Sequence, residues 1–217
     1  MDTKARIKLP GKVMWEALAN DPAIGCTILD AEGTVLCINP KAAELIFRRD
    51  PVDVTGRNLS ELLPEDWKQE RLDVFHQILA TNKPIVLRCI RDGRQLGSTF
   101  RLLDVDETGR ARFIAVTTVG EPDMPGLEAD YEVRESAHAD LGRLDVLSKR
   151  ELEVLALMSQ GLTLEGIANT LRRSPKTIEK HRHSIGQKLQ ESSRVKLAQL
   201  AAEAGLELHD AELKRAQ

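Results

Sequence analysis

Apolar residues change their spacing twice along this chain, and the changes divide it into three stretches. Between residues 23 and 119, short runs of β-branched and apolar residues enclose a helical middle. Residues 120–143 are acidic and irregular, whereas residues 147–205 carry apolar positions at the spacing of consecutive short helices. These sequence patterns predict two folded domains and a connector, and the sequence shows no internal repeats or low-complexity tracts.

Five segments of the first stretch have the composition of strands and are separated by turn residues or helices. They lie at residues 24–30, 34–39, 85–91, about 96–104 and 111–119. Residues 65–80, between the second and third of these segments, are predicted to form a helix. One face of this helix consists of Trp67, Arg71, Leu72, Phe75, Ile78 and Leu79. This order predicts an α+β domain, in which helices lie on one face of a five-stranded antiparallel sheet.

Four short helices are predicted in the third stretch, and each starts at a residue that caps helix N-termini. Ser148 and Glu151 have the spacing of a capping box. Ser174 precedes a proline at the first position of the third helix, and Thr163 and Ser193 start the second and fourth. We therefore expect an all-α four-helix domain.

The third of these helices, "SPKTIEKHRHSIGQKL" at residues 174–189, separates an apolar stripe from a basic face. The stripe consists of Ile178, Ile185 and Leu189. From Arg172 to Lys188, six lysines and arginines stand against one glutamate, a net charge of +5. Two helices joined by a short turn, the second of them basic, predict a helix-turn-helix whose second helix fits the major groove of DNA.

The charge distribution supports the same division. The formal charge of the whole chain is -3, but residues 144–206 hold ten Lys/Arg and seven Asp/Glu, a net of +3 that leaves -6 for the remainder. A polyanionic partner is therefore expected for one half only. The expected parts are an N-terminal extension (1–22), a sensor-like domain (23–120), an acidic connector (121–143), the helical domain (144–206) and a C-terminal tail (207–217).

Several function classes find no support in the sequence. The longest unbroken apolar run, Val154 to Met158, is too short to span a membrane, and no signal peptide is visible. Cys26, Cys37 and Cys89 lack metal-ligand spacing and are read as small buried residues in a reducing compartment. No catalytic arrangement is apparent, so we expect a cytoplasmic protein that is not an enzyme and holds no metal.

The first domain resembles a PAS sensor domain through "TILDAEGTVLCINPKAAEL", "VTGRNLSELLPED" and the closing "FIAVTTV". The resemblance implies a pocket for haem, flavin or a small metabolite, or no ligand at all. The cysteine-centred flavin motif of light sensors is missing, because "RNLSELLP" follows Gly56, so a flavin photoadduct is not expected. Haem and a small metabolite stay open, with His76 as a weak candidate for an iron ligand.

Residues 147–201, "LSKRELEVLALMSQGLTLEGIANTLRRSPKTIEKHRHSIGQKLQESSRVKLAQLA", resemble the LuxR-type (GerE-like) DNA-binding domain nearly end to end. The resemblance implies that three side chains reach base edges: Glu179, Lys180 and His183. It implies contacts to the DNA backbone from Ser174, Lys176, Thr177, His181, Arg182 and Lys188. It also makes the last helix a dimerisation helix, through Val195, Leu197, Ala198 and Ala201.

Three residues depart from the family pattern. Gly166 stands inside the second helix where the family usually has glutamate, Arg173 replaces an apolar turn residue, and Glu179 is acidic in a groove-facing position. The glutamate could accept a hydrogen bond from cytosine N4. These departures put target sequence and affinity in doubt, and they motivate an alternative, a PAS-based protein-interaction adaptor with a degenerate DNA-binding module.

The main reading is a transcriptional regulator in which a signal or dimerisation event in the PAS domain controls DNA binding. Its expected partners are double-stranded DNA, a second copy of the chain and RNA polymerase, with no membrane. The connector is read as a solvated spacer, as a helix that moves with the signal, or as an acidic mask of the basic face. A haem- or thiol-based redox enzyme is a third class, which no catalytic motif supports.

Overall fold

The computed structural model describes residues 16–17, 19–120 and 130–215, and the chain falls into two compact units. The first contains the described residues up to Pro84 together with Thr99–Thr117. The second contains Ile85–Ser98 and the described residues from Thr118 onward. In this division, residues 85–98 belong with the C-terminal helices.

The first unit is built on strands in the order β2-β1-β5-β4. Their bounds are β1 Gly25–Asp30, β2 Val35–Ile38, β4 Arg94–Val105 and β5 Ala111–Val119, of which β4 and β5 continue into the second unit. β1 pairs antiparallel with both β2 and β5. All four segments were predicted as strands, from their β-branched and apolar runs.

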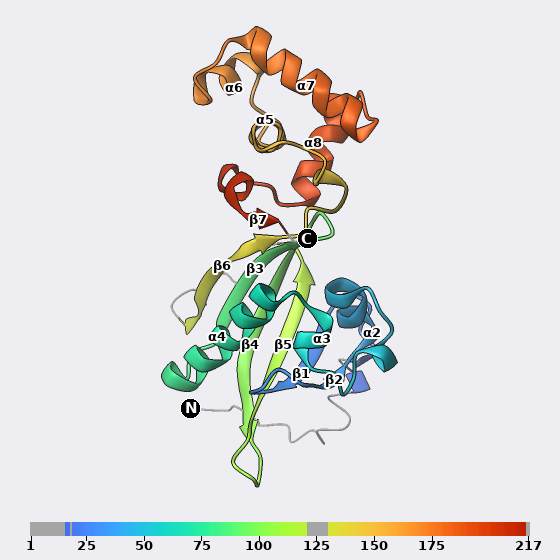
Figure 1. Cartoon of the computed structure of the whole chain (residues 1–217), viewed down its shortest axis with the longest axis vertical. Helices are drawn as coiled ribbons and strands as arrows, with labels where there is room; N and C mark the ends of the chain where they lie inside the picture. Colours follow the sequence, from blue (N-terminus) through green and yellow to red (C-terminus); the bar gives the residue numbers. More distant parts are fainter. Residues whose placement is uncertain (1–15, 18, 121–129, 216–217) are drawn as a thin grey trace, which may run out of the picture. The chain divides into compact units, whose positions relative to one another are not determined.

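Helices of the first unit gather on one face of these strands (Figure 1). They are α2 Pro40–Ala42, α3 Leu59–Leu62 and α4 Glu65–Thr81, with a π-helical turn at Ala43–Phe47 and a 3-10 turn at Pro51–Asp53. Ala42 packs on Gly25, so closely that a Cβ added at Gly25 would lie 3.0 Å from the Cα of Ala42. Phe75 of α4 stacks on Phe113, with ring centroids 4.4 Å apart, and Phe113 pairs with Leu29 on the same face as Gly25.

The buried face of α4 differs in part from the predicted one. Trp67, Arg71, Phe75 and Ile78 are buried as expected, and Val74 joins them. Leu72 is half-buried and Leu79 is 45% exposed, which corrects their assignment to the core face. Both residues lie at the border of the buried face of α4, next to its exposed side.

The connector contains a strand, where a helix was one of the alternatives expected from sequence. β6, Glu132–Ala139, pairs in parallel with β3, Ile85–Arg91, and β7, Lys214–Arg215, pairs in parallel with β6. The second unit therefore has the strand order β4-β3-β6-β7, and the parallel strands β6 and β7 extend the five predicted strands into a mixed sheet. Residues 121–129 of the predicted connector lie outside the described residues.

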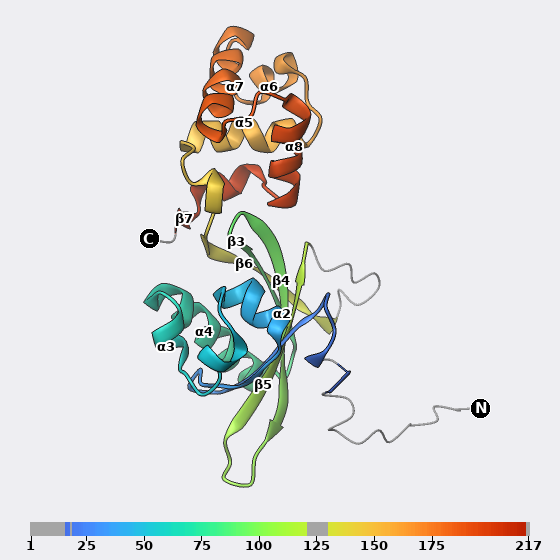
Figure 2. The same cartoon turned by 90° about the vertical axis from the view of Figure 1, so that its right-hand side faces the viewer.

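Four helices complete the second unit (Figure 2), and all four were predicted. They are α5 Lys149–Ser159, α6 Leu164–Thr170, α7 Pro175–Leu189 and α8 Arg194–Glu203. The predicted caps are confirmed. Each helix follows a capping residue whose side-chain oxygen accepts a hydrogen bond from a backbone N–H in the first turn; the capping residues are Ser148, Thr163, Ser174 and Ser193.

The apolar core of the helices extends onto the strands of the same unit. Ile90 of β3 and Ala139 of β6 belong to one buried cluster with Leu144, Leu152 and Ile185. The turn after β3 lies close to a 3-10 turn at Gly142–Leu144, which precedes α5. A Cβ on Gly142 would lie 2.7 Å from the carbonyl carbon of Asp92. This packing explains why residues 85–98 belong to the helical unit.

Candidate nucleic-acid interface

The turn between α6 and α7 is tightly fixed by backbone hydrogen bonds. Arg172 adopts a left-handed φ of 52°, and Arg173 donates its N–H to Ala168 O at 2.8 Å. Arg150 of α5 donates to Leu171 O at 2.8 Å and pairs with Glu153. The two helices are therefore joined in the geometry of a helix-turn-helix, with α7 as its second helix.

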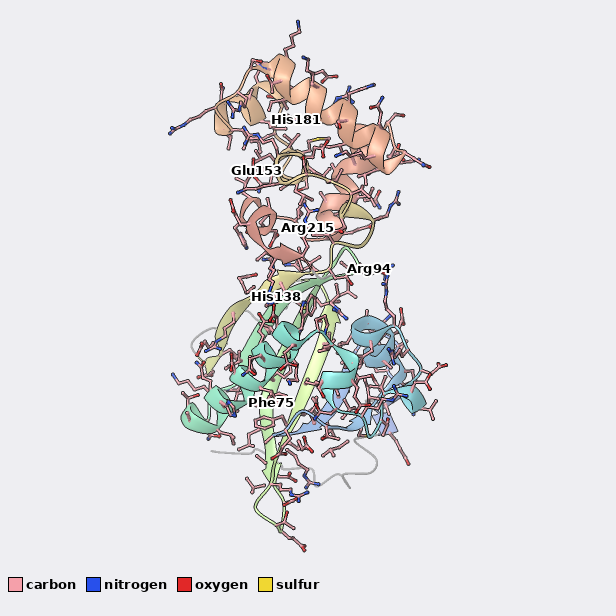
Figure 3. All side chains as sticks on the ribbon, in the orientation of Figure 1. Phe75, Arg94, His138, Glu153, His181 and Arg215 are labelled. Atoms are coloured by element: carbon pink, nitrogen blue, oxygen red, sulfur yellow. The ribbon has the colours of Figure 1, made fainter. Side chains whose placement is uncertain are left out.

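Helix α7 presents a polar outer face opposite its buried stripe (Figure 3). Ile178 and Ile185 are fully buried, and Leu189 is 4% exposed, as predicted. The exposed positions of the opposite face are Lys176, Lys180, His183 and Gln187. The predicted base-contacting residues Lys180 and His183 therefore share one accessible surface. Gln187 belongs to the same surface and was missed because it carries no charge.

Glu179, the acidic member of the predicted base-contacting set, is held by Arg182. Arg182 Nε donates to Glu179 Oε2 at 3.1 Å, and Nη2 donates to Oε1 at 2.5 Å. The hydrogen bond from Arg182 lowers the pKa of Glu179, and the carboxylate in turn raises the pKa of Arg182. The pair contributes no net charge to the face, and Arg182 is already engaged before any phosphate approaches.

Lys188, predicted to contact the DNA backbone, is joined to helix α5. Its Nζ lies 2.6 Å from Glu151 Oε2, and Ser184 Oγ donates to Glu151 Oε1 at 2.6 Å. Glu151 is buried and also accepts the N–H of Ser148 at 2.7 Å. Burial raises the pKa of Glu151, but the bonds from Lys188, Ser184 and Ser148 outweigh it and bring the pKa to about 2.

The remaining predicted backbone contacts surround the N-terminus of α7. Ser174 and Lys176 are exposed, and Thr177 and His181 are half-buried. The hydroxyls of Ser174 and Thr177 lie 2.8 Å apart, and Ser174 Oγ accepts the N–H of Thr177. Exposed hydroxyls and amides at the N-terminus of a long helix favour a phosphate group, because the helix dipole is positive there.

The predicted dimerisation residues of α8 separate into two groups. Leu197 and Ala201 are fully buried in the core of the helical domain, so they have no surface to offer a second copy. Val195 is 76% exposed, and Ala198 is half-buried. Sequence periodicity marks which α8 residues are apolar, but it does not distinguish those that face the domain's own core.

The PAS-like part holds two features that bear on ligand binding. Thr27 Oγ1 is buried, and no group in the described part of the chain forms a hydrogen bond with it. His76 is exposed on α4, so the weak candidate for a haem ligand does not face an enclosed site. Burial raises the pKa of the Cys26 thiol to about 11, with a smaller contribution from Cys37, which makes it a poor nucleophile at neutral pH.

Within the described ranges, no three His, Cys, Asp or Glu side chains converge in a way that would hold a metal ion. None of the helices in the same ranges is long and apolar enough to cross a membrane.

Comparison with known proteins identifies both parts. The family "Bacterial regulatory proteins, luxR family" matches residues 145–201, and the PAS fold matches residues 14–119. The transcription regulator BvgA of Bordetella pertussis is 36% identical over 73 residues, which are 34% of this chain and 35% of BvgA. The transcriptional regulatory protein UhpA of Escherichia coli K12 is 44% identical over 57 residues, 26% of this chain and 29% of UhpA.

The chain thus spans about a third of the length of these curated relatives. Among solved structures, a VqmA–ligand–DNA complex from Vibrio cholera is 21% identical, with a TM-score of 0.46 over 91% of this chain and 90% of that one. Residues 145–201 of the chain are a LuxR-family regulatory domain, and residues 14–119 are a PAS fold.

Proposed function

We propose that this protein is a transcriptional regulator that binds double-stranded DNA through helix α7. The observation that carries the proposal is the exposed cationic face of α7, opposite a buried stripe, in a fixed helix-turn-helix. A helix of this kind enters the major groove with its side chains against base edges. The matched LuxR-family relatives, both named as transcription regulators, support the same function.

The side chains of α7 take different roles in this proposal. Lys180 and His183 reach base edges, whereas Lys176 and the hydroxyls of Ser174 and Thr177 hold phosphates beside the helix N-terminus. Glu179 accepts a hydrogen bond from cytosine N4, and the two bonds from Arg182 fix the direction of its carboxylate. His181 and Lys188 contribute to the backbone contacts from the flank of the helix.

The proposal extends to partners and signal. The chain acts in the cytoplasm as a homodimer, in which Val195 and Ala198 of α8 form the contact between the two copies. RNA polymerase is the downstream partner. The PAS fold senses a small molecule, for which the buried hydroxyl of Thr27 offers one hydrogen bond. No enzymatic step is part of this proposal.

The adaptor alternative rests on Gly166 and Arg173, and the geometry does not favour it. A Cβ on Gly166 would have its nearest neighbour at 3.5 Å, so the position tolerates glycine or a larger residue without distortion. Arg173 is exposed, and its N–H still closes the turn onto Ala168. Both departures therefore leave the helix-turn-helix intact.

The experiment is selection of binding sites from a random duplex library by the full chain, followed by fluorescence anisotropy on the selected site. Lys180→Ala should weaken binding to the selected site by about tenfold, from the loss of about 1–3 kcal/mol at a base contact, and relax preference at one position. Lys83→Ala, an exposed lysine beyond the end of α4, is the matched control. Failure to enrich any duplex would overturn the proposal and favour the adaptor.

A further inference from the structure

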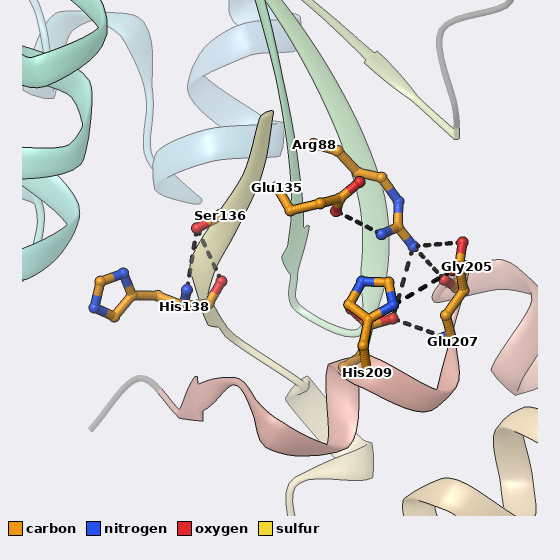
Figure 4. A network of polar contacts seen from close by, with 8 residues as sticks. Arg88, Glu135, Ser136, His138, Gly205, Glu207 and His209 are labelled. Atoms are coloured by element: carbon orange, nitrogen blue, oxygen red, sulfur yellow. Dashed lines mark hydrogen bonds and ion pairs between the residues drawn. The ribbon is translucent and has the colours of Figure 1, made fainter. Parts of the chain in front are cut away.

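The second unit buries an arginine away from the DNA-binding face. Arg88 lies on β3 and is 4% exposed. Its Nη1 donates to Glu135 Oε2 at 2.6 Å, and its Nη2 donates to Gly205 O at 2.7 Å (Figure 4). Nη2 also lies 3.4 Å from Glu207 Oε1 and 3.6 Å from Asp210 Oδ2. The guanidinium is thus surrounded by acceptors from three segments.

These segments come from different parts of the chain. Arg88 lies within the residues that match the PAS fold, and Glu135 lies on the connector strand β6. Gly205, Glu207 and Asp210 follow α8, just beyond the residues that match the LuxR family. One side chain therefore joins a strand of the sensing fold to the end of the DNA-binding domain.

The charges of the cluster do not balance. One guanidinium faces three carboxylates, and the imidazole of His209 lies 3.5 Å from Glu207 and from Asp210. Burial raises the pKa of Asp210, which is 2% exposed, and its carboxylate is stabilised by the backbone N–H of Glu207, which donates to Oδ2 at 2.7 Å, and by the charge of Arg88. Glu135 and Glu207 are about half exposed, whereas Arg88 and Asp210 are buried. The buried pair depends strongly on geometry, because an uncompensated buried charge is costly.

Other contacts make the junction specific. A Cβ on Gly205 would overlap the side chain of Gln95, which lies on β4, so the chain needs glycine where it passes this strand. Asp140 donates its N–H to Ile90 O at 3.0 Å, and Gly93 donates to Asp140 O at 3.0 Å. The strands and the helical domain thus meet through directional bonds in addition to the shared apolar cluster.

We propose that Arg88 is a latch that fixes the DNA-binding domain on strands β3 and β6, and that the sensing domain changes DNA binding by opening it. Because Lys180 and His183 stay exposed with the latch closed, it acts by setting the direction of α7 and does not mask the basic face. A small shift between β3 and β6 is enough to break the bonds of the cluster, since hydrogen bonds weaken steeply with distance and angle. This inference rests on the proposed DNA-binding function.

The first test is hydrogen–deuterium exchange of the full chain. Arg88→Met alone leaves the buried carboxylate of Asp210 without the charge of Arg88 and can unfold the domain, so the principal variant is Arg88→Met combined with Asp210→Asn. We expect exchange in residues 205–212 to rise at least tenfold, while α5 and α7 keep their protection. Arg112→Met is the matched control, because Arg112 forms an exposed bidentate pair with Asp104 in the first unit.

The second test compares a two-fold DNA site with its isolated half-site. The double variant should bind the half-site within twofold of the wild type, because α7 is unchanged. It should bind the two-fold site at least tenfold more weakly, because two unlatched domains must first be oriented. Unchanged exchange in residues 205–212, or an unchanged ratio of two-fold to half-site affinity, would overturn the latch. Loss of half-site binding by the wild type would instead refute the proposed function.

Discussion

Replacing Glu151 by glutamine removes the buried carboxylate that joins the first and third helices of the DNA-binding domain. The carboxylate accepts three hydrogen bonds, from Ser148 N–H, Ser184 Oγ and Lys188 Nζ, at 2.6–2.7 Å. Glutamine is nearly isosteric, but its amide offers one oxygen in place of two and cannot attract the ammonium of Lys188. The substitution therefore tests the ion pair with little change in volume.

The magnitude follows from the pKa of Glu151. Its fall from 4.5 to about 2 corresponds to roughly 3 kcal/mol of stability, at 1.36 kcal/mol per pKa unit. Since the folded-state pKa is the lower one, this stability is fully present above pH 4.5 and is lost as the pH falls toward 2. Glu151→Gln should therefore lower the free energy of unfolding by about 2–3 kcal/mol at pH 7.

Urea denaturation of the full chain, followed by circular dichroism, measures this difference. Between pH 7 and pH 3 the gap between wild type and Glu151→Gln should shrink, because the unfolded wild type binds a proton at Glu151 in this range while the folded state, with a pKa of about 2, stays mostly ionised. Glu165→Gln is the control: Glu165 is exposed on α6 and forms no ion pair among the described residues, so its substitution should change stability by less than about 0.5 kcal/mol. A Glu151→Gln variant as stable as the wild type at pH 7, or a gap that does not depend on pH, would refute the reasoning.

Three further predictions address the DNA-reading side chain, the domain junction and the dimer. Glu179→Gln should relax the preference for cytosine at one position of the selected site and strengthen binding to random duplex by about twofold to tenfold, as measured by anisotropy, because a negative charge leaves the interface. Gly142→Ala should destabilise the chain by about 2 kcal/mol or more in urea titrations, because the residue has a φ of 52° and an added Cβ would meet Asp92 at 2.7 Å. Val195→Asp should raise the dimer dissociation constant at least tenfold in sedimentation equilibrium without lowering the unfolding midpoint, because this side chain is 76% exposed; an unchanged dimer constant would place the contact elsewhere.

The helix-turn-helix could be predicted almost residue by residue, because its signals are local. Ser174 caps α7, proline follows it, and Ile178 and Ile185 are buried as their spacing predicts. Each of these features depends on residues within one or two helical turns, so the sequence alone displays it.

The connector strand could not be predicted, because its partner lies far along the chain. Val133 pairs with Val86, and the segment "EVRESAHA" has too few apolar residues to show the alternation of a buried strand. A helical spacing also runs through the connector, at Leu127, Tyr131, Arg134, His138 and Leu141. A parallel strand of this kind is specified by its neighbour, here the almost fully buried β3, more than by its own composition.

The ion pairs of α7 were also invisible to sequence reasoning. Lys188 and Glu151 are 37 positions apart, and only the packing of α7 against α5 brings their charges together. The resemblance to the family marked Lys188 for the DNA backbone, and it marked Leu197 and Ala201 for the dimer, without showing that all three serve the domain's own structure. Periodicity identifies an apolar face, and tertiary packing decides what covers it.

Amide chemical-shift mapping tests the central claim most directly. Addition of a selected duplex to the ¹⁵N-labelled full chain should shift amides of residues 174–188 most strongly, with smaller changes near the turn at Arg172 and none clustered on β1 or β2. The same residues should return toward their starting positions as salt is raised, since phosphate contacts release counterions. Shifts concentrated outside α7, or no shifts with any selected duplex, would contradict DNA recognition by this helix.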